Sequence, residues 1–225
     1  MSHNRSPLLE PLPLHEDAAV ASLRRTMDGA GSAFDFVVLR VPPSSVAVGV
    51  EHHRDALQAL FEAVEARNLQ RRHEFFALHP AHADGPCEAL QFHTAQAVAA
   101  PLDARAVLPA AYFLPGYRVG VSRAAGDVSW FEWLAQAFDN PPYTLRVHDP
   151  EVHARLFPKF CACTGLMPGE NIEVLDWVGD PEREPGRSTW SSYFDDGKEW
   201  WGIWCLTVWN PRHRTLAAIA ASQTD

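Results

Sequence analysis

Cysteines and long apolar runs are scarce in this chain, and each scarcity excludes a class of protein. Four cysteines in 225 residues are too few for a disulfide scaffold, so free thiols in a reducing compartment are expected. No run of about 18 apolar residues occurs, and residues 1–14 lack a basic region followed by an apolar stretch, which predicts neither a membrane span nor a secretory signal. We therefore expect a cytoplasmic protein.

Lysine is nearly absent, since only Lys159 and Lys198 accompany seventeen arginines. Together with the many alanines, this ratio is typical of a GC-rich bacterial coding sequence, so the arginines are not evidence for phosphate recognition. The formal net charge of −9 repels phosphate backbones and lowers the expectation of nucleic-acid binding. A basic ligand or a basic protein partner is favoured instead, with no nucleic-acid or membrane partner.

The fingerprints of catalysis and nucleotide binding are missing as well. The sequence contains no G-x-S-x-G, no G-x-G-x-x-G and no G-x₄-G-K-[ST], which are the loops that present a nucleophilic serine or cradle phosphates. A thiol triad could be drawn from Cys161, His148 and Asp176, and acid–base pairs from Asp195 with Asp196 or Glu173 with Asp176. Ordinary structural or solvated roles are favoured for each of these groups.

Metal-ligand spacing is weak throughout the chain. Cys161-Ala-Cys163 is not the C-x₂-C of zinc sites, no second cysteine pair follows it, and on a helix its side chains point about 200° apart. The adjacent pair His52 and His53 at a helix start is expected at the surface. We predict no cofactor and no metal. If a metal were bound, its first candidates would be the histidines around Cys87, namely His73, His79, His82 and His93.

What is present is the composition of a globular protein, with 47% apolar and 21% charged residues. Eight Trp and twelve Phe can fill a sizeable core. The length predicts a single domain over residues 15–225, preceded by a loose lead-in over residues 1–14.

Hydrophobic periodicity and breaker residues predict alternating helices and strands. Asp127 and Asp149 are expected N-caps, Pro150 begins the last helix, and Gly165 ends it. Helices are predicted over 15–27, 52–67, 127–138 and 149–164. Strands are predicted over 33–41, 71–78, 89–94, 112–122, 143–148, 172–178, 200–209 and 216–221. Residues 95–111 receive no assignment.

The segment Trp200–Trp209 is apolar on both alternating faces, which predicts a strand covered on both sides. Residues 216–221 are expected to pair with it as an antiparallel hairpin. Strands and helices do not alternate strictly, so the fold class predicted is α+β: a mixed, mainly antiparallel sheet with helices packed on it and the C-terminal β-hairpin central in the sheet.

The most distinctive stretch combines acids with aromatic rings. Between Glu170 and Glu199 nine acids face three bases, a local balance of −6. Rings beside acids predict a surface that binds a basic protein. The candidate partner-binding residues are Trp190, Tyr193, Phe194, Asp195, Asp196 and Glu199. In the alternative interpretation, Tyr193 and Phe194 pack inward while residues 195–197 turn the chain into the strand.

These observations favour a non-enzymatic cytoplasmic protein that binds another protein. Its general character is similar in kind to immunity proteins, which neutralise toxins in interbacterial competition, although the similarity is one of type and covers no defined span. Two alternatives stay open. One is a small-molecule enzyme or binder with a pocket lined by Trp and His, and the other is a metal-dependent hydrolase that uses the histidines of residues 73–93.

Overall fold

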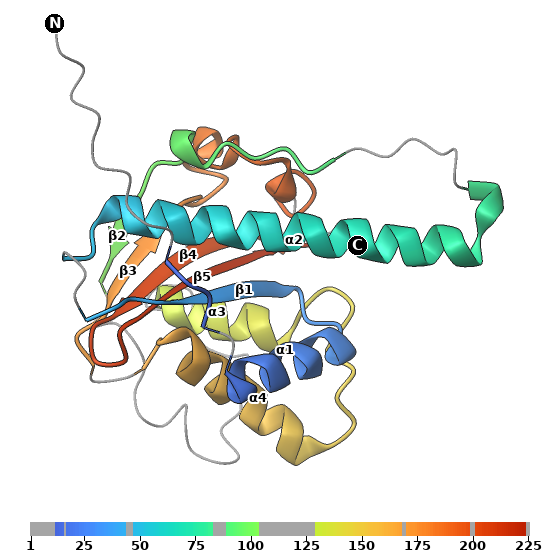
Figure 1. Ribbon diagram of the computed structural model, residues 1–225, viewed down its shortest axis with the longest axis horizontal. Coiled ribbons are helices and arrows are strands. Elements are labelled where there is room, and N and C mark those ends of the chain that lie inside the picture. Colours follow the sequence, from blue (N-terminus) through green and yellow to red (C-terminus); the bar gives the residue numbers. More distant parts are fainter. Residues whose placement is uncertain are drawn as a thin grey trace, which may run out of the picture.

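A five-stranded sheet forms the centre of the computed structural model, which describes residues 12–15, 17–43, 47–82, 89–103, 129–167, 170–198 and 201–223. Its strand order is β1-β5-β4-β3-β2, and every neighbouring pair is antiparallel (Figure 1). The strands are β1 (Phe34–Arg40), β2 (Ala100–Leu102), β3 (Glu173–Asp176), β4 (Ile203–Asn210) and β5 (Thr215–Ser222). The predicted α+β class and the central β4–β5 hairpin are confirmed.

Helices cover both faces of this sheet. Helix α2 (Val50–Leu78) crosses one face, whereas α1 (Ala18–Ala30), α3 (Trp130–Asp139) and α4 (Pro150–Thr164) cover the opposite face (Figure 1). Successive side chains of the central strands point to opposite faces of the sheet, so each face has its own hydrophobic core. Leu206 and Val208 pack toward α3 and α4, whereas Cys205 packs toward α2. Both faces of β4 are therefore covered, as its continuous apolar character predicted.

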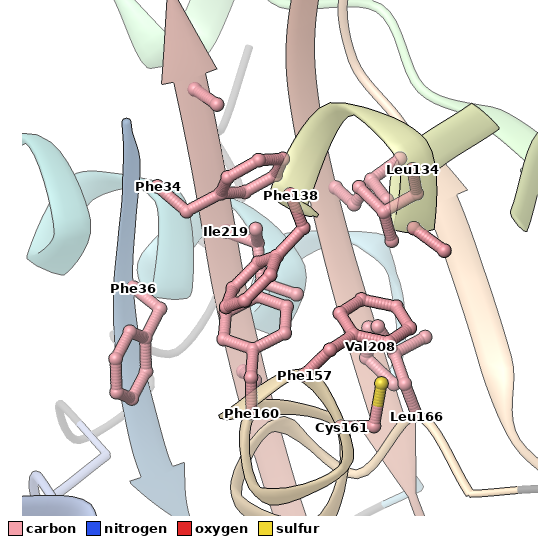
Figure 2. Close-up of a cluster of buried hydrophobic side chains, with 14 of the residues drawn as sticks. Phe34, Phe36, Leu134, Phe138, Phe157, Phe160, Cys161, Leu166, Val208 and Ile219 are labelled. Carbon is pink, nitrogen blue, oxygen red and sulfur yellow. The ribbon is translucent and has the colours of Figure 1, made fainter. Parts of the chain in front are cut away.

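The core on the α3 and α4 side is rich in phenylalanine. Phe138 and Phe160 have ring centroids 4.9 Å apart, and Phe34 reaches both of them from β1 (Figure 2). Strand β5 supplies alanines that are fully buried, so helices on both sides can approach its backbone closely. Trp204 is only half-buried beside this core.

The helix ends follow their capping residues. Asp149 Oδ1 accepts hydrogen bonds from the Glu151 and Val152 amides, and Gly165 ends α4 at a φ of 81°, as predicted. Helix α3 is instead capped by Ser129, whose hydroxyl accepts from the Glu132 amide. The predicted cap Asp127 lies outside the described residues.

Several predicted strands are wrong. Residues 71–78 continue α2, because extending an existing helix adds one hydrogen bond per residue without a new nucleation cost. Residues 89–94 form a single bridge, between Phe92 and Ser191. Residues 143–148 form no strand, since Thr144 has a φ of 54° and the Arg146 amide donates to the Ala30 carbonyl. Strand β2 falls within the unassigned residues 95–111, and the predicted strand over 112–122 lies outside the described residues.

The end of the predicted lead-in has defined neighbours. Leu14 forms a bridge to Leu39, and the Arg40 amide donates to the Pro13 carbonyl, so these residues extend along the outer edge of β1. In the described part of the chain, no helix has both the length and the apolar character needed to cross a membrane.

Candidate functional site

Two of the aromatic rings predicted to bind a partner lie in the core. Trp190 and Phe194 are buried, and their ring centroids lie 5.1 and 5.9 Å from that of Phe61 on α2. The Trp190 indole N–H also donates to the Trp177 carbonyl at 3.1 Å. The structure corrects the prediction for these two residues: they anchor the segment and do not contribute to its surface.

Tyr193 fixes the same segment to two further elements. Its hydroxyl donates to Asp35 Oδ2 at 2.9 Å, and Asp35 Oδ1 forms an ion pair with Arg67 of α2 at 2.5 Å. Burial, and secondarily the Asp35 charge, raise the pKa of Tyr193 well above its ordinary value, which keeps the hydroxyl protonated as a donor. The hydrogen bond to Asp35 therefore holds the half-buried Tyr193 in place, and its hydroxyl is already used within the chain.

The carboxylates that follow these rings are exposed. Asp195 accepts a hydrogen bond from the Lys198 ammonium at 3.0 Å, and Asp196 is exposed with no ion pair among the described residues. Gly197 closes the turn against the end of β5, where a Cβ atom would lie 3.0 Å from the Gln223 nitrogen. The structure thus contains both features of the alternative interpretation of this segment: the rings pack inward, and residues 195–197 form a turn. Glu199 lies outside the described residues.

Residues 179–198, which we call the acidic loop, are held at their other end by Arg187. This guanidinium pairs with Asp176 at 3.2 Å and with Glu184 at 3.0 Å, and it donates to the Asp176 and Val98 carbonyls. Burial raises the pKa of Asp176 despite these contacts. Arg183 pairs with Asp180 at 3.4 Å, so the loop is partly neutralised by its own bases.

The acids between Glu170 and Glu199 do not form one patch. Glu170 lies at the β4–β5 turn, where it pairs with Arg212 at 3.1 Å and with His213 at 3.3 Å. Burial by itself would raise the pKa of Glu170, but a hydrogen bond from Asn210 and the two cations outweigh it and lower that pKa. The predicted local charge of −6 is therefore divided between separate sites, and part of it is neutralised.

Two of the candidate metal histidines, His73 and His93, lie far apart. The residue after His93, Thr94, contacts Arg54 and Gln58 in the first half of α2, whereas His73 lies fifteen residues beyond Gln58 on the same helix. That separation is roughly 22 Å along the helix axis, too far for one metal ion. His79 ends α2, and neither the side chain of His82 nor Cys87 is described. Over the described ranges, no three His, Cys, Asp or Glu side chains are placed to hold a metal.

The thiols have the surroundings of core residues. Cys161 and Cys205 are completely buried, and burial raises both of their pKa values well above the ordinary range. Cys163 is half-buried and its pKa is also raised by burial. Because the thiolate is the nucleophile, these environments oppose thiol catalysis. Asp176, a member of the triad considered above, is held by Arg187 and by the Val178 and Gly179 amides.

A buried polar cluster was missed by the sequence analysis, which expected His53 at the surface. The His53 ring is fully buried, and its Nδ1 lies 2.7 Å from Thr207 Oγ1, which also accepts the Trp177 indole N–H at 2.8 Å. An indole can only donate, so Thr207 Oγ1 accepts from Trp177, and the tautomer of the ring decides whether Thr207 or His53 is the donor in the contact between them. The other ring nitrogen is Nε2. That nitrogen has no partner among the described residues.

Burial, reinforced by the neighbouring His52, lowers the pKa of His53 to about 4. The ring is consequently neutral near pH 7. Thr207 is the one polar side chain within the apolar run Trp204–Trp209, and this was the sequence signal that could have suggested a buried polar partner. The cluster links α2 and β4 to Trp177, the residue that follows β3, which indicates a structural role.

Comparison with known proteins adds no assignment, because no family model, no curated protein and no solved structure matches this chain. Its function has to be argued from the arrangement of its own residues. In the described part of the chain, that arrangement combines protonated core thiols, an enclosed neutral histidine and a firmly anchored loop with exposed carboxylates.

Proposed function

We propose that this chain is a non-enzymatic, cytoplasmic protein-binding protein whose acidic loop contacts a basic protein partner. The observation that carries the proposal is that exposed carboxylates lie next to aromatic side chains that are buried in the core. Trp190 and Phe194 fix the loop to the core, while Asp195 and Asp196 remain exposed beside them. A loop fixed before binding loses less conformational freedom in a complex, so more of its interaction energy becomes affinity.

Electrostatics supports a basic partner. The whole chain carries a net charge of −9, which steers a basic surface toward it and accelerates encounter, most strongly at low salt. Glu182 is a further exposed carboxylate of the acidic loop, and like Asp196 it has no ion pair within the described ranges. The immunity-type form of the proposal, in which the basic partner is a toxin that the protein neutralises, rests on this same surface.

The catalytic alternatives would require side chains that already have structural roles. His53 is enclosed by Thr207 and the α2 core, Asp176 is occupied by Arg187, and Cys161 is a protonated core thiol. Each would have to leave its present contacts before it could act on a substrate. No observation on the described residues favours these alternatives over binding.

A double charge reversal tests the proposal. Asp195→Lys with Asp196→Lys changes the acidic loop, and Glu51→Lys with Glu151→Lys is the matched control, because it reverses two exposed carboxylates on other elements and also breaks helix ion pairs. Immobilised wild type is expected to retain a basic protein from host lysate, identified by mass spectrometry. The loop variant should lose that protein and the control should keep it.

Thermal melts of all three proteins establish that they are folded. The proposal fails if a folded loop variant retains the same proteins as wild type. It also fails if the specifically retained proteins are acidic, because the charge argument would then have the wrong sign.

A further inference from the structure

The first half of the acidic loop, residues 180–187, has no side chain in the core. Six of its eight side chains are exposed, and only Pro181 and Arg187 are half-buried. The second half differs, because Trp190 and Phe194 are buried against Phe61. A segment without buried apolar contacts opens at a low cost in free energy, so another contact has to hold the first half against the fold.

Arg187 provides that contact. Its Nη1 lies 3.2 Å from Asp176 Oδ2 and 3.0 Å from Glu184 Oε2. Its Nη2 donates to the Asp176 carbonyl at 2.8 Å and to the Val98 carbonyl at 3.1 Å. The guanidinium thereby joins the loop to the end of β3 and to the segment that precedes β2. The Arg187 side chain is only 15% exposed, so water screens these contacts less than it screens a surface ion pair.

The other hydrogen bonds of residues 180–187 reach only residues close by in the sequence, as from the Glu184 amide to the Asp180 carbonyl. Arg183 pairs with Asp180 at 3.4 Å, but the Arg183 side chain is 86% exposed, so this ion pair contributes little order. Among the described residues, Arg187 is therefore the one side chain that connects this half of the loop to β3 and to Val98.

Gly179 makes the close approach of the guanidinium possible. It has a φ of 67°, and a Cβ atom at this position would lie 2.6 Å from Arg187 Nη1 and 2.5 Å from Glu184 Oε2. Any other residue would push these groups away, and its backbone would be strained in the left-handed region. Arg187 consequently packs directly over a residue that has no side chain.

We propose that Arg187 is a positioning residue of the partner-binding surface, and that it holds the three carboxylates of residues 180–187 in the arrangement that a folded basic protein contacts. These carboxylates belong to Asp180, Glu182 and Glu184. The role rests on the proposed function of the acidic loop. The charge of Arg187 by itself repels a basic partner, whereas its contacts fix the loop before binding and reduce the conformational entropy lost in the complex. The two effects of this side chain on affinity therefore have opposite signs.

Three variants of the full chain separate positioning from charge. Arg187→Gln and Lys198→Gln each remove one positive charge from the acidic loop, but Lys198 contacts only the exposed Asp195. Arg187→Lys keeps the charge and loses the planar fork that reaches several acceptors at once. The probe is cytochrome c, a folded basic protein, and its association and dissociation rates are measured by biolayer interferometry at about 20 mM salt, where charges are weakly screened.

Charge alone predicts that both glutamine variants bind cytochrome c more tightly than wild type. We expect this only for Lys198→Gln. Arg187→Gln and Arg187→Lys should bind about fivefold more weakly than wild type, mainly because the complex dissociates faster. Trypsin gives a second measurement without the probe: cleavage after the exposed Arg183 should be about tenfold faster in Arg187→Gln than in Lys198→Gln.

Thermal melts establish which variants are folded. Equal affinities of folded Arg187→Gln and Lys198→Gln, or equal rates of cleavage after Arg183, overturn the positioning role and leave the proposed function standing. If Arg187→Gln does not fold, Arg187→Lys decides, because its net charge is that of wild type and an unchanged affinity overturns the role. If wild type binds cytochrome c no more tightly than the Asp195→Lys, Asp196→Lys variant does, the proposed function fails and the role of Arg187 fails with it.

Discussion

Acidification from pH 8 to pH 5 is expected to destabilise this protein through His53. The ring is fully buried, and its pKa is about 4 in the folded chain, against an ordinary value of 6.5 in an unfolded chain. The unfolded state therefore binds a proton at a higher pH than the folded state does. The stability that the neutral ring provides is fully present above pH 6.5 and is lost as the pH falls toward 4.

The size of the effect follows from these two pKa values. At about 1.4 kcal/mol per pH unit, the complete loss is about 3 kcal/mol, and about 2 kcal/mol of it has occurred by pH 5. Burial raises the pKa values of Asp55, Asp139 and Asp176, so these carboxyls contribute with the opposite sign. Glu170, whose pKa is lowered, loses its contribution only below its ordinary value of 4.5. Among these groups, the histidine is the one whose shifted pKa destabilises the folded chain between pH 6.5 and pH 5.

Urea unfolding followed by tryptophan fluorescence at pH 8, 6.5 and 5 measures this slope. His53→Leu is expected to be less stable than wild type at pH 8, because it removes the hydrogen bond between the buried ring and the Thr207 hydroxyl. It should also lose about 2 kcal/mol less than wild type between pH 8 and 5. His73→Gln changes an exposed histidine and should keep the wild-type slope. An unchanged slope in His53→Leu would refute the reasoning.

Two further substitutions test the packing that supports the candidate surfaces. Thr207→Val leaves the Trp177 indole N–H and the buried imidazole unpaired and should cost about 2–4 kcal/mol in urea unfolding, whereas Thr207→Ser keeps the hydroxyl and should recover most of it. Gly197→Ala drives a methyl group against Ser222 and the backbone at the end of β5 and should lower the free energy of unfolding by about 1–3 kcal/mol. Gly186→Ala, where nothing lies within 4 Å, is its control, and equal melting temperatures of the two alanine variants would contradict the packing argument.

Local sequence signals predicted the elements whose ends depend on neighbouring residues. The Asp149 cap, Pro150 and the Gly165 stop define α4 because each acts on backbone groups within one turn. The apolar character of both faces of residues 200–209 predicted a covered strand, and its pairing with residues 216–221 required only a short connection. The predicted class and central hairpin follow from such short-range patterns.

The tertiary structure decided which side of each segment faces the core. Residues 71–78 are helical because they extend α2 past the sheet, and Trp190 and Phe194 are anchors because Phe61, far away in the sequence, packs against them. Glu170 and Asp196 belong to the same acidic stretch of the sequence. They lie at separate sites of the fold, because β3, which comes between them in the sequence, leads the chain away from the β4–β5 turn.

The candidate surfaces show the same division. The sequence by itself determined the amount of charge and its order along the chain. Only the fold determined which acids are neutralised, by Arg187 or Arg212, and which remain exposed. The His53–Thr207 contact joins residues 154 positions apart. No local pattern specifies such a pair, because it forms only when packing brings α2 onto β4 and removes both groups from water.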